Sequence, residues 1–200
     1  MELINDFQVS VRKAFDEIDS NWESYKGLVV CGTHSPKNVE GIIEKIREAR
    51  ETGKPFLGIC SGMQIAIVEY ARNVLNLNGA NTQEIEQNPL YPVVVKMPLL
   101  RIGMKEVEYE KGVYRFESHW HNYCFNPMYE KAFRNTPEEH FGGFDIIFTK
   151  DIINIAEIMK IREGNSFFTL VQFHPEYQSS KEKPHPILVE FITKCKKYGR

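Results

Sequence analysis

The stretch PFLGICSGMQIAIVEYARNVL, residues 55–75, decides the fold class. It starts as a short apolar run, PFLGI, that is typical of a buried strand, and it continues directly into a helix-forming segment. One cysteine, Cys60, stands at the junction between Gly58 and Gly62. A strand that turns at once into a helix is half of a strand-helix-strand unit, so the stretch favours an α/β fold.

The residues before this stretch repeat the same alternation. A strand is predicted at 27–32 (GLVVCG). A helix is predicted at 37–51, where apolar residues recur every three or four positions and Gly53 supplies the stop. A further helix is predicted at 5–20. Strand, helix, strand, helix implies parallel strands joined by crossovers, with helices on both faces of the sheet.

Strand-like runs dominate the second half of the chain. Gly, Pro or Asn turn signals separate several of them, and a final helix with a basic last turn is predicted at about 186–198. The strand-like runs are YPVVVKM (91–97), LLRIGMKEVEYE (99–110), VYRFESHWHNYCF (113–125), FDIIFTKD (144–151), INIAEIMKIRE (153–163) and SFFTLVQF (166–173). We therefore expect one α/β domain over 1–200 with a strand-rich second half.

Composition and charge exclude several classes of function. The chain has 200 residues, is 42% hydrophobic and carries a formal net charge of -2. It has neither the basic excess of a nucleic-acid-binding protein nor an apolar run of about 18 residues, so we expect neither nucleic acid nor a membrane as a partner. The N-terminus lacks a signal-peptide pattern, and the 4 cysteines form no CxxC pair. We expect a cytoplasmic protein with reduced thiols.

The motif around Cys60 has a chemical interpretation. The pattern G-x-C-x-G has the shape of a nucleophile elbow, in which a tight turn exposes the nucleophile. The following helix points its free N–H groups and the positive end of its dipole at the sulfur, which favours thiolate over thiol. The backbone N–H of Ser61 is placed where an oxyanion forms. Because cysteine is also a common buried residue, the motif alone fits a structural role equally well.

A cysteine nucleophile needs a base, and the sequence offers His174 in VQFHPEY. Glu176, two residues on, shares its side of an extended segment and could orient the imidazole. A surface His-Pro-Glu turn is the alternative for this segment. His119 and His121 share a strand face, but no third ligand is evident, so no metal site is expected. The remaining histidines are expected to face solvent: His34, His140 and His185.

Together these motifs resemble the glutaminase domain of class I glutamine amidotransferases, in the CTP synthase branch. The resemblance runs from PFLGICSGMQIAIVEYARNVLNLNGANTQE (55–84) through ESHWHNYCFNP (117–127) to QFHPEYQSS (172–180). It implies a flavodoxin-like, three-layer α/β fold with a mainly parallel central sheet and a small antiparallel portion. It also implies a hydrolase that releases ammonia from glutamine through a γ-glutamyl thioester, without a cofactor.

The resemblance assigns roles position by position. It makes Cys60 the nucleophile, His174 the general base and acid, and Glu176 the group that orients His174. Gln64 and Glu84 match positions that contact the bound glutamine, and the Glu84 carboxylate suits the α-ammonium group of that substrate. Further substrate contacts are implied at Gly32, Thr33, Ser61, Asn122 and Tyr123.

The sequence departs from the family pattern at three places. The family's PGGFG loop reads CGTHS here, so Thr33 and Ser35 replace glycines that permit positive φ and close approach to the substrate. The family's RHRHRYE segment reads SHWHNYC, so Asn122 replaces an arginine and loses its charge and fork geometry. We expect the chain to lack the family's first strand and its amidoligase domain, because no GxxxxGK[ST] phosphate-binding motif occurs and the sequence starts almost at the first predicted helix.

Three functions stay open at this point. The first is a glutaminase that acts alone or supplies ammonia to a separate synthetase or amidoligase subunit. The second is a binding or regulatory protein that keeps the fold without the chemistry, which the changes at Thr33 and Asn122 suggest. The third is an amidase for another γ-glutamyl amide, which Trp120 and Asn122 suggest because the family has basic residues there.

Overall fold

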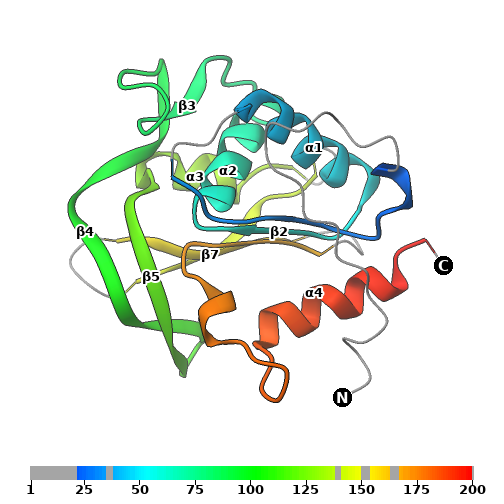
Figure 1. Ribbon diagram of the computed structural model, residues 1–200. Helices are drawn as coiled ribbons and strands as arrows, with labels where there is room; N and C mark the ends of the chain where they lie inside the picture. Colours follow the sequence, from blue (N-terminus) through cyan, green and yellow to red (C-terminus); the bar gives the residue numbers. More distant parts are fainter. Residues whose placement is uncertain (1–21, 35–37, 138–140, 150–153, 163–166, 200) are drawn as a thin grey trace.

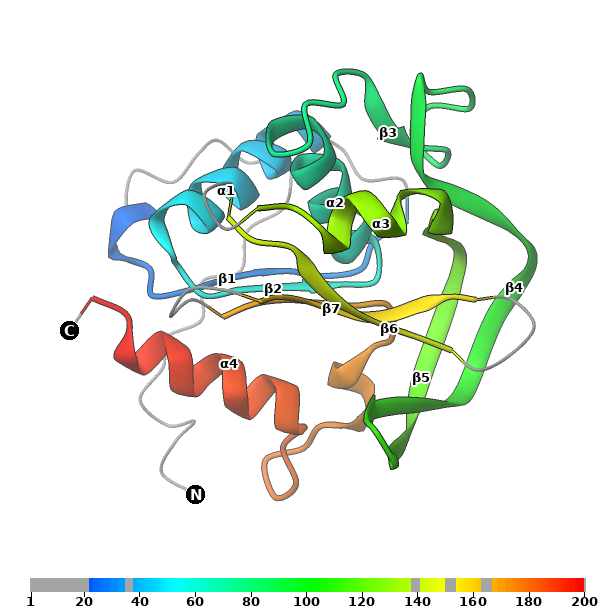
Figure 2. The ribbon, with the colours of Figure 1, turned by 180° about the vertical axis from the view of Figure 1, so that it is seen from behind.

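A five-stranded sheet lies between helices on its two faces (Figure 1; Figure 2). The computed structural model describes residues 22–34, 38–137, 141–149, 154–162 and 167–199. In these residues the elements are η1 (Trp22–Ser24), β1 (Leu28–Val30), α1 (Val39–Thr52), β2 (Phe56–Ile59), α2 (Ser61–Asn73), β3 (Ala80–Thr82), β4 (Tyr91–Glu110), β5 (Val113–Phe125), η2 (Pro127–Tyr129), α3 (Glu130–Arg134), β6 (Phe144–Phe148), β7 (Ala156–Ile161), β8 (Phe168–Val171), η4 (Pro175–Gln178) and α4 (Pro186–Lys197), where η marks a 3-10 helix.

The central sheet has the order β1-β2-β8-β7-β6. Strands β1, β2 and β8 are parallel, whereas β7 runs antiparallel to both β8 and β6. The predicted α/β fold class is confirmed. The antiparallel share is larger than expected, because only two of the four pairings of this sheet among the described residues are parallel.

Helices cover both faces of the central sheet. Helices α1 and α2 lie on one face and α4 on the other (Figure 1). Helix α1 ends at the predicted stop, where Gly53 adopts the left-handed conformation with φ of 69° and its N–H donates to the Arg50 carbonyl. Helix α4 confirms the predicted last helix and begins with Pro186 in its first turn. The helix predicted at 5–20 lies outside the described residues.

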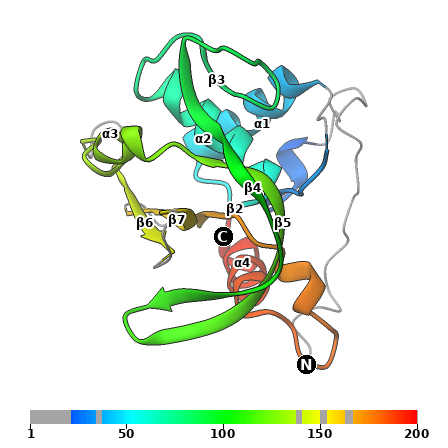
Figure 3. The ribbon, with the colours of Figure 1, turned by 90° about the vertical axis from the view of Figure 1, so that its left-hand side faces the viewer.

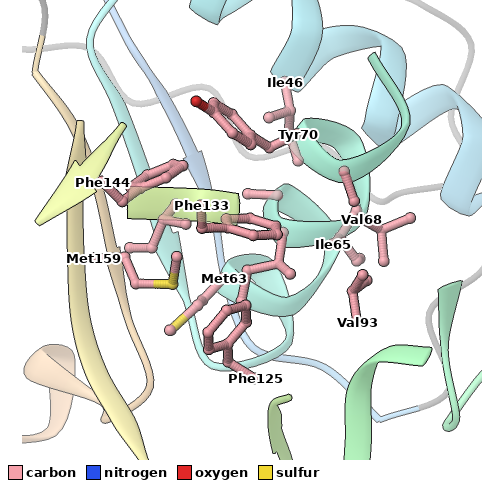
Figure 4. Close-up of a cluster of buried hydrophobic side chains, with 14 of the residues drawn as sticks. Ile46, Met63, Ile65, Val68, Tyr70, Val93, Phe125, Phe133, Phe144 and Met159 are labelled. Atoms are coloured by element: carbon pink, nitrogen blue, oxygen red, sulfur yellow. The ribbon is translucent and has the colours of Figure 1, made fainter. Parts of the chain in front are cut away.

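Two hydrophobic cores flank the sheet. Between the sheet and α2, the rings of Tyr70, Phe125, Phe133 and Phe144 pack against one another (Figure 4). On the α4 side, the buried cluster includes Leu57, Phe173 and Ile187. Every residue of β2 and β8 is buried, and apart from Thr169 in β8 their sequences lack the polar residues that a strand with one solvent-facing side would carry at alternate positions.

The second sheet has the order β3-β4-β5. Its strands β4 and β5 form a long hairpin, and the short strand β3 pairs with β4. The two strands predicted at 91–97 and 99–110 are one continuous strand, β4, whose pairing with β5 shifts register between Lys96 and Arg101. Figure 3 shows the hairpin arching from the α2 side of the central sheet to the α4 side. Its Val93 packs in the α2 core and its Val107 in the α4 core, so the hairpin joins both layers.

Candidate active site

Cys60 occupies a strained turn between β2 and α2. Its φ is 53° and its ψ is -111°, a backbone conformation that non-glycine residues rarely adopt. The turn is held because the Cys60 N–H donates to the Val171 carbonyl at 2.8 Å and the Cys60 carbonyl accepts from the Gln64 N–H at 3.2 Å. Strain of this kind persists where the surrounding structure over-determines it, and it clusters at functional sites.

Glycines on either side make this turn sterically feasible. A Cβ atom on Gly62 would lie 2.0 Å from the Val30 carbonyl oxygen, and a Cβ atom on Gly58 would lie 3.0 Å from the Gly62 backbone. Neither contact could be relieved by a side-chain rotation, because the atoms met are backbone atoms. The G-x-C-x-G spacing is therefore a packing requirement of the elbow, as the sequence predicted.

His174 follows β8 and pairs with Glu176. The His174 N–H donates to the Ser118 carbonyl at 2.8 Å, and its Nδ1 lies 2.7 Å from Glu176 Oε1. The expected contact between His174 and Glu176 is present. The prediction of an extended backbone here is wrong, because residues 175–178 form the 3-10 turn η4. The turn, which Pro175 starts, brings the carboxylate back to the ring.

The Cys60 sulfur and the His174 ring converge beneath the loop that follows β1. A Cβ atom on Gly32 would lie 2.9 Å from His174 Cε1 and 3.6 Å from Cys60 Sγ, so both side chains meet at this glycine. Burial opposes a charge on His174, but its interactions with Cys60 and Glu176 outweigh burial and raise the pKa of His174 to about 9. At neutral pH the ring is therefore protonated, and an imidazolium lies beside the Cys60 side chain.

The other thiols of the described residues lack such a partner. Burial raises the pKa of Cys124 to about 11 and that of Cys195 to about 12. Burial and the nearby Glu176 carboxylate also raise the pKa of Cys31. These three cysteines stay protonated at neutral pH, so among the described cysteines Cys60 alone lies beside a histidine base.

The loop that carries the expected oxyanion contacts is tied to the elbow. The Thr33 N–H donates to the Ser61 hydroxyl oxygen at 2.8 Å and is therefore already engaged. The Ser61 N–H opens helix α2, where the first N–H groups have no acceptor within the helix. The structure thus brings Gly32, Thr33, Ser61 and Cys60 together, and the Ser61 N–H lies at a helix N-terminus, which favours the binding of an anion.

Gln64 of α2 contacts Tyr123, the residue after Asn122 in β5. The Gln64 Nε2 group donates to the Tyr123 carbonyl at 3.1 Å and to Gln172 Oε1 at 3.4 Å. Asn122 Oδ1 and Gln172 Nε2 are buried with no hydrogen-bond partner among the described residues. Buried polar atoms are normally paired, so these atoms are available to a bound molecule.

Glu84 is placed in a different element. It lies half-buried in the turn after β3, where its N–H donates to Thr82 Oγ1 at 3.1 Å. Its expected role toward the substrate's α-ammonium group stays a prediction.

Two histidines of β5, His119 and His121, are buried and form hydrogen bonds inside the protein. His119 Nε2 lies 2.9 Å from Glu157 Oε2, while Arg101 holds the other oxygen of that carboxylate at 2.6 Å. His121 donates from Nδ1 to the Tyr123 carbonyl, and burial lowers its pKa to about 3, so that ring is neutral. No group of three His, Cys, Asp or Glu side chains in the described part of the chain could hold a metal ion.

The prediction for His185 is wrong. It was expected to face solvent, yet it is buried, and it caps α4 by accepting from the Ile187 N–H through Nδ1. Its Nε2 therefore carries the proton and donates to Glu117 Oε1 at 3.0 Å, beside the Tyr109 hydroxyl at 2.7 Å from the same oxygen. His34 is exposed as expected, and His140 lies outside the described residues.

Two aromatic side chains border the dyad. The Tyr177 ring stacks on the His174 ring at 5.0 Å with an interplanar angle of 14°. Trp120 is 52% exposed; its carbonyl oxygen lies 3.7 Å from Cys60 Sγ, and its indole is 6.4 Å from the His34 ring. The sequence reasoning missed Tyr177 and Gln172, although both lie within three residues of His174.

Among the residues that the structure describes, none of the helices has the length and apolar character needed to cross a bilayer.

Comparisons with known proteins show what this chain is similar to. The family described as "Glutamine amidotransferase class-I" matches residues 4–194. CTP synthase of Clostridium acetobutylicum is 37% identical over 197 residues, covering 88% of this chain and 35% of the relative, and CTP synthase of Bacillus subtilis is 37% identical over 185 residues, covering 83% and 33%. The chain thus spans about a third of the length of these curated relatives.

Solved structures give the same fold. The glutaminase domain of the Trypanosoma brucei CTPS, solved with bound acivicin, superposes with a TM-score of 0.76 at 26% identity, covering 88% of this chain and 72% of that one. A Thermoplasma acidophilum protein described as a GMP synthase subunit shares the fold at 20% identity and a TM-score of 0.51, covering 86% of this chain and 73% of that one.

Proposed function

Because this chain belongs to the class I glutamine amidotransferase family, we propose that it hydrolyses the side-chain amide of glutamine to glutamate and ammonia. One observation carries the proposal. Cys60 sits on a strained elbow, the His174 ring lies beside it, and Glu176 holds the far ring nitrogen at 2.7 Å. A nucleophile, a base and a group that orients the base are the set that covalent acyl transfer requires.

The first half-reaction forms a thioester. The Cys60 thiolate attacks the amide carbon, and a C–S bond forms. The His174 imidazolium gives its proton to the amide nitrogen, the C–N bond breaks and ammonia leaves. The N–H of Ser61 stabilises the oxyanion of the tetrahedral intermediate. Glu176 keeps the imidazole in the orientation in which Nε2 faces the sulfur.

The second half-reaction restores the enzyme. His174, now neutral, takes a proton from water, and the water oxygen attacks the thioester carbon. The C–S bond breaks, the thiolate returns and glutamate is released. One glutamine and one water thus give one glutamate and one ammonia. Glu84 pairs with the substrate's α-ammonium group in this proposal, and Gln64, Asn122 and Tyr123 line the substrate beside Gly32 and Thr33.

A separate synthetase or amidoligase subunit is the proposed acceptor of the ammonia. The relatives named CTP synthase are about three times as long as the matched part of this chain, so they contain further domains. On the β4–β5 hairpin, the exposed side chains of Ile102, Met104 and Phe116 continue from Trp120 at the site and offer an apolar surface for such a protein.

A second candidate substrate has its own support. Trp120 and Tyr177 border the dyad with exposed aromatic surface, which suits an apolar group on the leaving nitrogen better than it suits bare ammonia. The substrate would then be a γ-glutamyl amide with an apolar N-substituent. A panel that compares glutamine with γ-glutamyl alkylamides and anilides separates the two, because the preferred substrate shows the higher kcat/KM.

The proposal is tested by ammonia and glutamate release from glutamine. We expect turnover by the wild-type protein, and a loss of at least about 10³-fold in kcat for both Cys60→Ala and His174→Ala, because members of such a relay act as a unit. Ser180→Ala, a change in an exposed loop outside the relay, retains wild-type turnover. Equal rates in the wild type and Cys60→Ala would refute the proposal.

A further inference from the structure

We propose that the Ser61 hydroxyl clasps the backbone of Gly32 and Thr33 over Cys60, and so acts as a positioning residue for the reaction. The inference rests on the proposed function for its kinetic consequence, whereas the clasp itself is a structural statement. It concerns a side chain, whereas the contribution assigned to Ser61 above is its backbone N–H.

The clasp is a single hydrogen bond between distant segments. The Ser61 hydroxyl oxygen accepts from the Thr33 N–H at 2.8 Å, across 28 residues of sequence. Ser61 is buried at the first position of α2, next to the nucleophile, whereas Thr33 is exposed in the loop after β1. A rigid, buried group therefore holds an exposed loop.

The held loop lies directly on the reacting groups. The Gly32 α-carbon faces the dyad so closely that an added Cβ would be 3.0 Å from Cys60 Cβ and 2.9 Å from His174 Cε1. A shift of this backbone by about 1 Å would change the space in which a substrate carbonyl meets the sulfur, and misplacement on that scale costs about 10²-fold in rate. The hydroxyl thus controls a distance on which the chemistry depends.

The clasp also explains how a threonine can occupy position 33. The Thr33 N–H is engaged with Ser61 and does not point at a substrate oxyanion. The loop therefore contributes its position to the site, and the donor to the oxyanion is the Ser61 N–H at the start of α2. The Ser61 hydroxyl then positions the loop, and the Ser61 backbone N–H stabilises the oxyanion in the same step.

Hydrogen exchange tests the clasp without any turnover. In the wild type we expect the Thr33 amide to exchange slowly although the residue is exposed, and in Ser61→Ala we expect it to exchange about tenfold faster. Ser180→Ala is the matched control, because its hydroxyl accepts from the Lys183 N–H at 3.1 Å in a remote exposed loop, and it leaves the Thr33 rate unchanged. Equal Thr33 exchange in wild type and Ser61→Ala would overturn the clasp.

Kinetics test its role in positioning. We expect kcat of Ser61→Ala to fall about tenfold with KM within about twofold of wild type, because the loss is confined to the transition state. Ser61→Thr keeps the hydroxyl and restores most of kcat. An unchanged or raised kcat in Ser61→Ala would overturn the positioning role. A wild type that turns over no glutamine refutes the proposed function instead, and the exchange result then still decides the clasp.

Discussion

Replacing Glu176 by glutamine isolates the charge that acts on His174. Glutamine keeps the side-chain length and an oxygen that can accept from Nδ1, so the ring keeps its orientation while the carboxylate charge is lost. In the wild type, Nδ1 and Oε1 are 2.7 Å apart, and the interactions with Cys60 and Glu176 outweigh burial to raise the pKa of His174 to about 9.

The size of the effect follows from this geometry. Two unit charges about 4 Å apart interact by about 1 kcal/mol in water and by about 4 kcal/mol at an effective dielectric constant of about 20. The Glu176 side chain is 40% exposed, which places the interaction in the lower half of that range. One pKa unit corresponds to about 1.4 kcal/mol, so Glu176→Gln lowers the pKa of His174 by about 1 to 2 units.

The assay is the pH dependence of kcat/KM for glutamine. The imidazolium is present below the pKa of His174 and is lost as the pH rises through it, so the wild type loses activity above about pH 9. In Glu176→Gln this loss moves to lower pH by about 1 to 2 units, which gives about a tenfold deficit at pH 8.5 and little deficit near pH 6.5.

Two further measurements make this result decisive. The proton resonance of the His174 Cε1–H titrates with a midpoint that shifts by the same amount. Glu182→Gln removes an equal charge from an exposed position in the loop after η4, and its pH profile superimposes on that of the wild type. If the basic limb of Glu176→Gln coincides with that of the wild type, the control of the His174 pKa by the Glu176 charge is refuted.

Three other substitutions test separate parts of the structure. Gly62→Ala forces a Cβ to within 2.0 Å of the Val30 carbonyl oxygen and lowers the free energy of unfolding by about 3 kcal/mol or more; an unchanged melting temperature would contradict the elbow packing. Glu69→Ala leaves the buried Arg50 guanidinium without the carboxylate that holds it at 2.7 Å, and chemical denaturation should show a loss of about 3–5 kcal/mol, with a loss below about 1 kcal/mol contradicting the prediction. Glu84→Gln raises KM for glutamine by about tenfold or more with a smaller change in kcat, and an unchanged KM would remove Glu84 from the substrate site.

The sequence predicted those parts of the fold that local patterns determine. The apolar period of the helix predicted at 37–51, the glycine that ends this helix and the direct passage from strand to helix at Cys60 are all local features, and the structure confirms them with α1 at Val39–Thr52. The parallel pairing of β2 with β8 joins Phe56 to Phe168, which are far apart in the sequence, so no local pattern reveals it. The five-residue helix α3 is too short to show a period.

The residues of the candidate site were also predicted where a local pattern marks them and missed where they depend on contacts between distant segments. The motif spacing placed Cys60 and found His174 with Glu176, because these residues lie in short, patterned segments. The burial of His185 was missed, since its partner Glu117 lies in a strand 68 residues away. The hydrogen bond between Thr33 and Ser61 was missed for the same reason: each residue looks like an ordinary polar position until the loop and the elbow meet.

The most direct test of the central claim is to identify which residue a glutamine-like electrophile modifies. A chloroketone analogue of glutamine is incubated with the protein, and the modified peptide is sequenced by mass spectrometry. Cys60 as a nucleophile activated by His174 predicts one adduct, on Cys60, that excess glutamine suppresses and that forms far more slowly in His174→Ala. No adduct, or an adduct on Cys31 with Cys60 unmodified, would contradict the account.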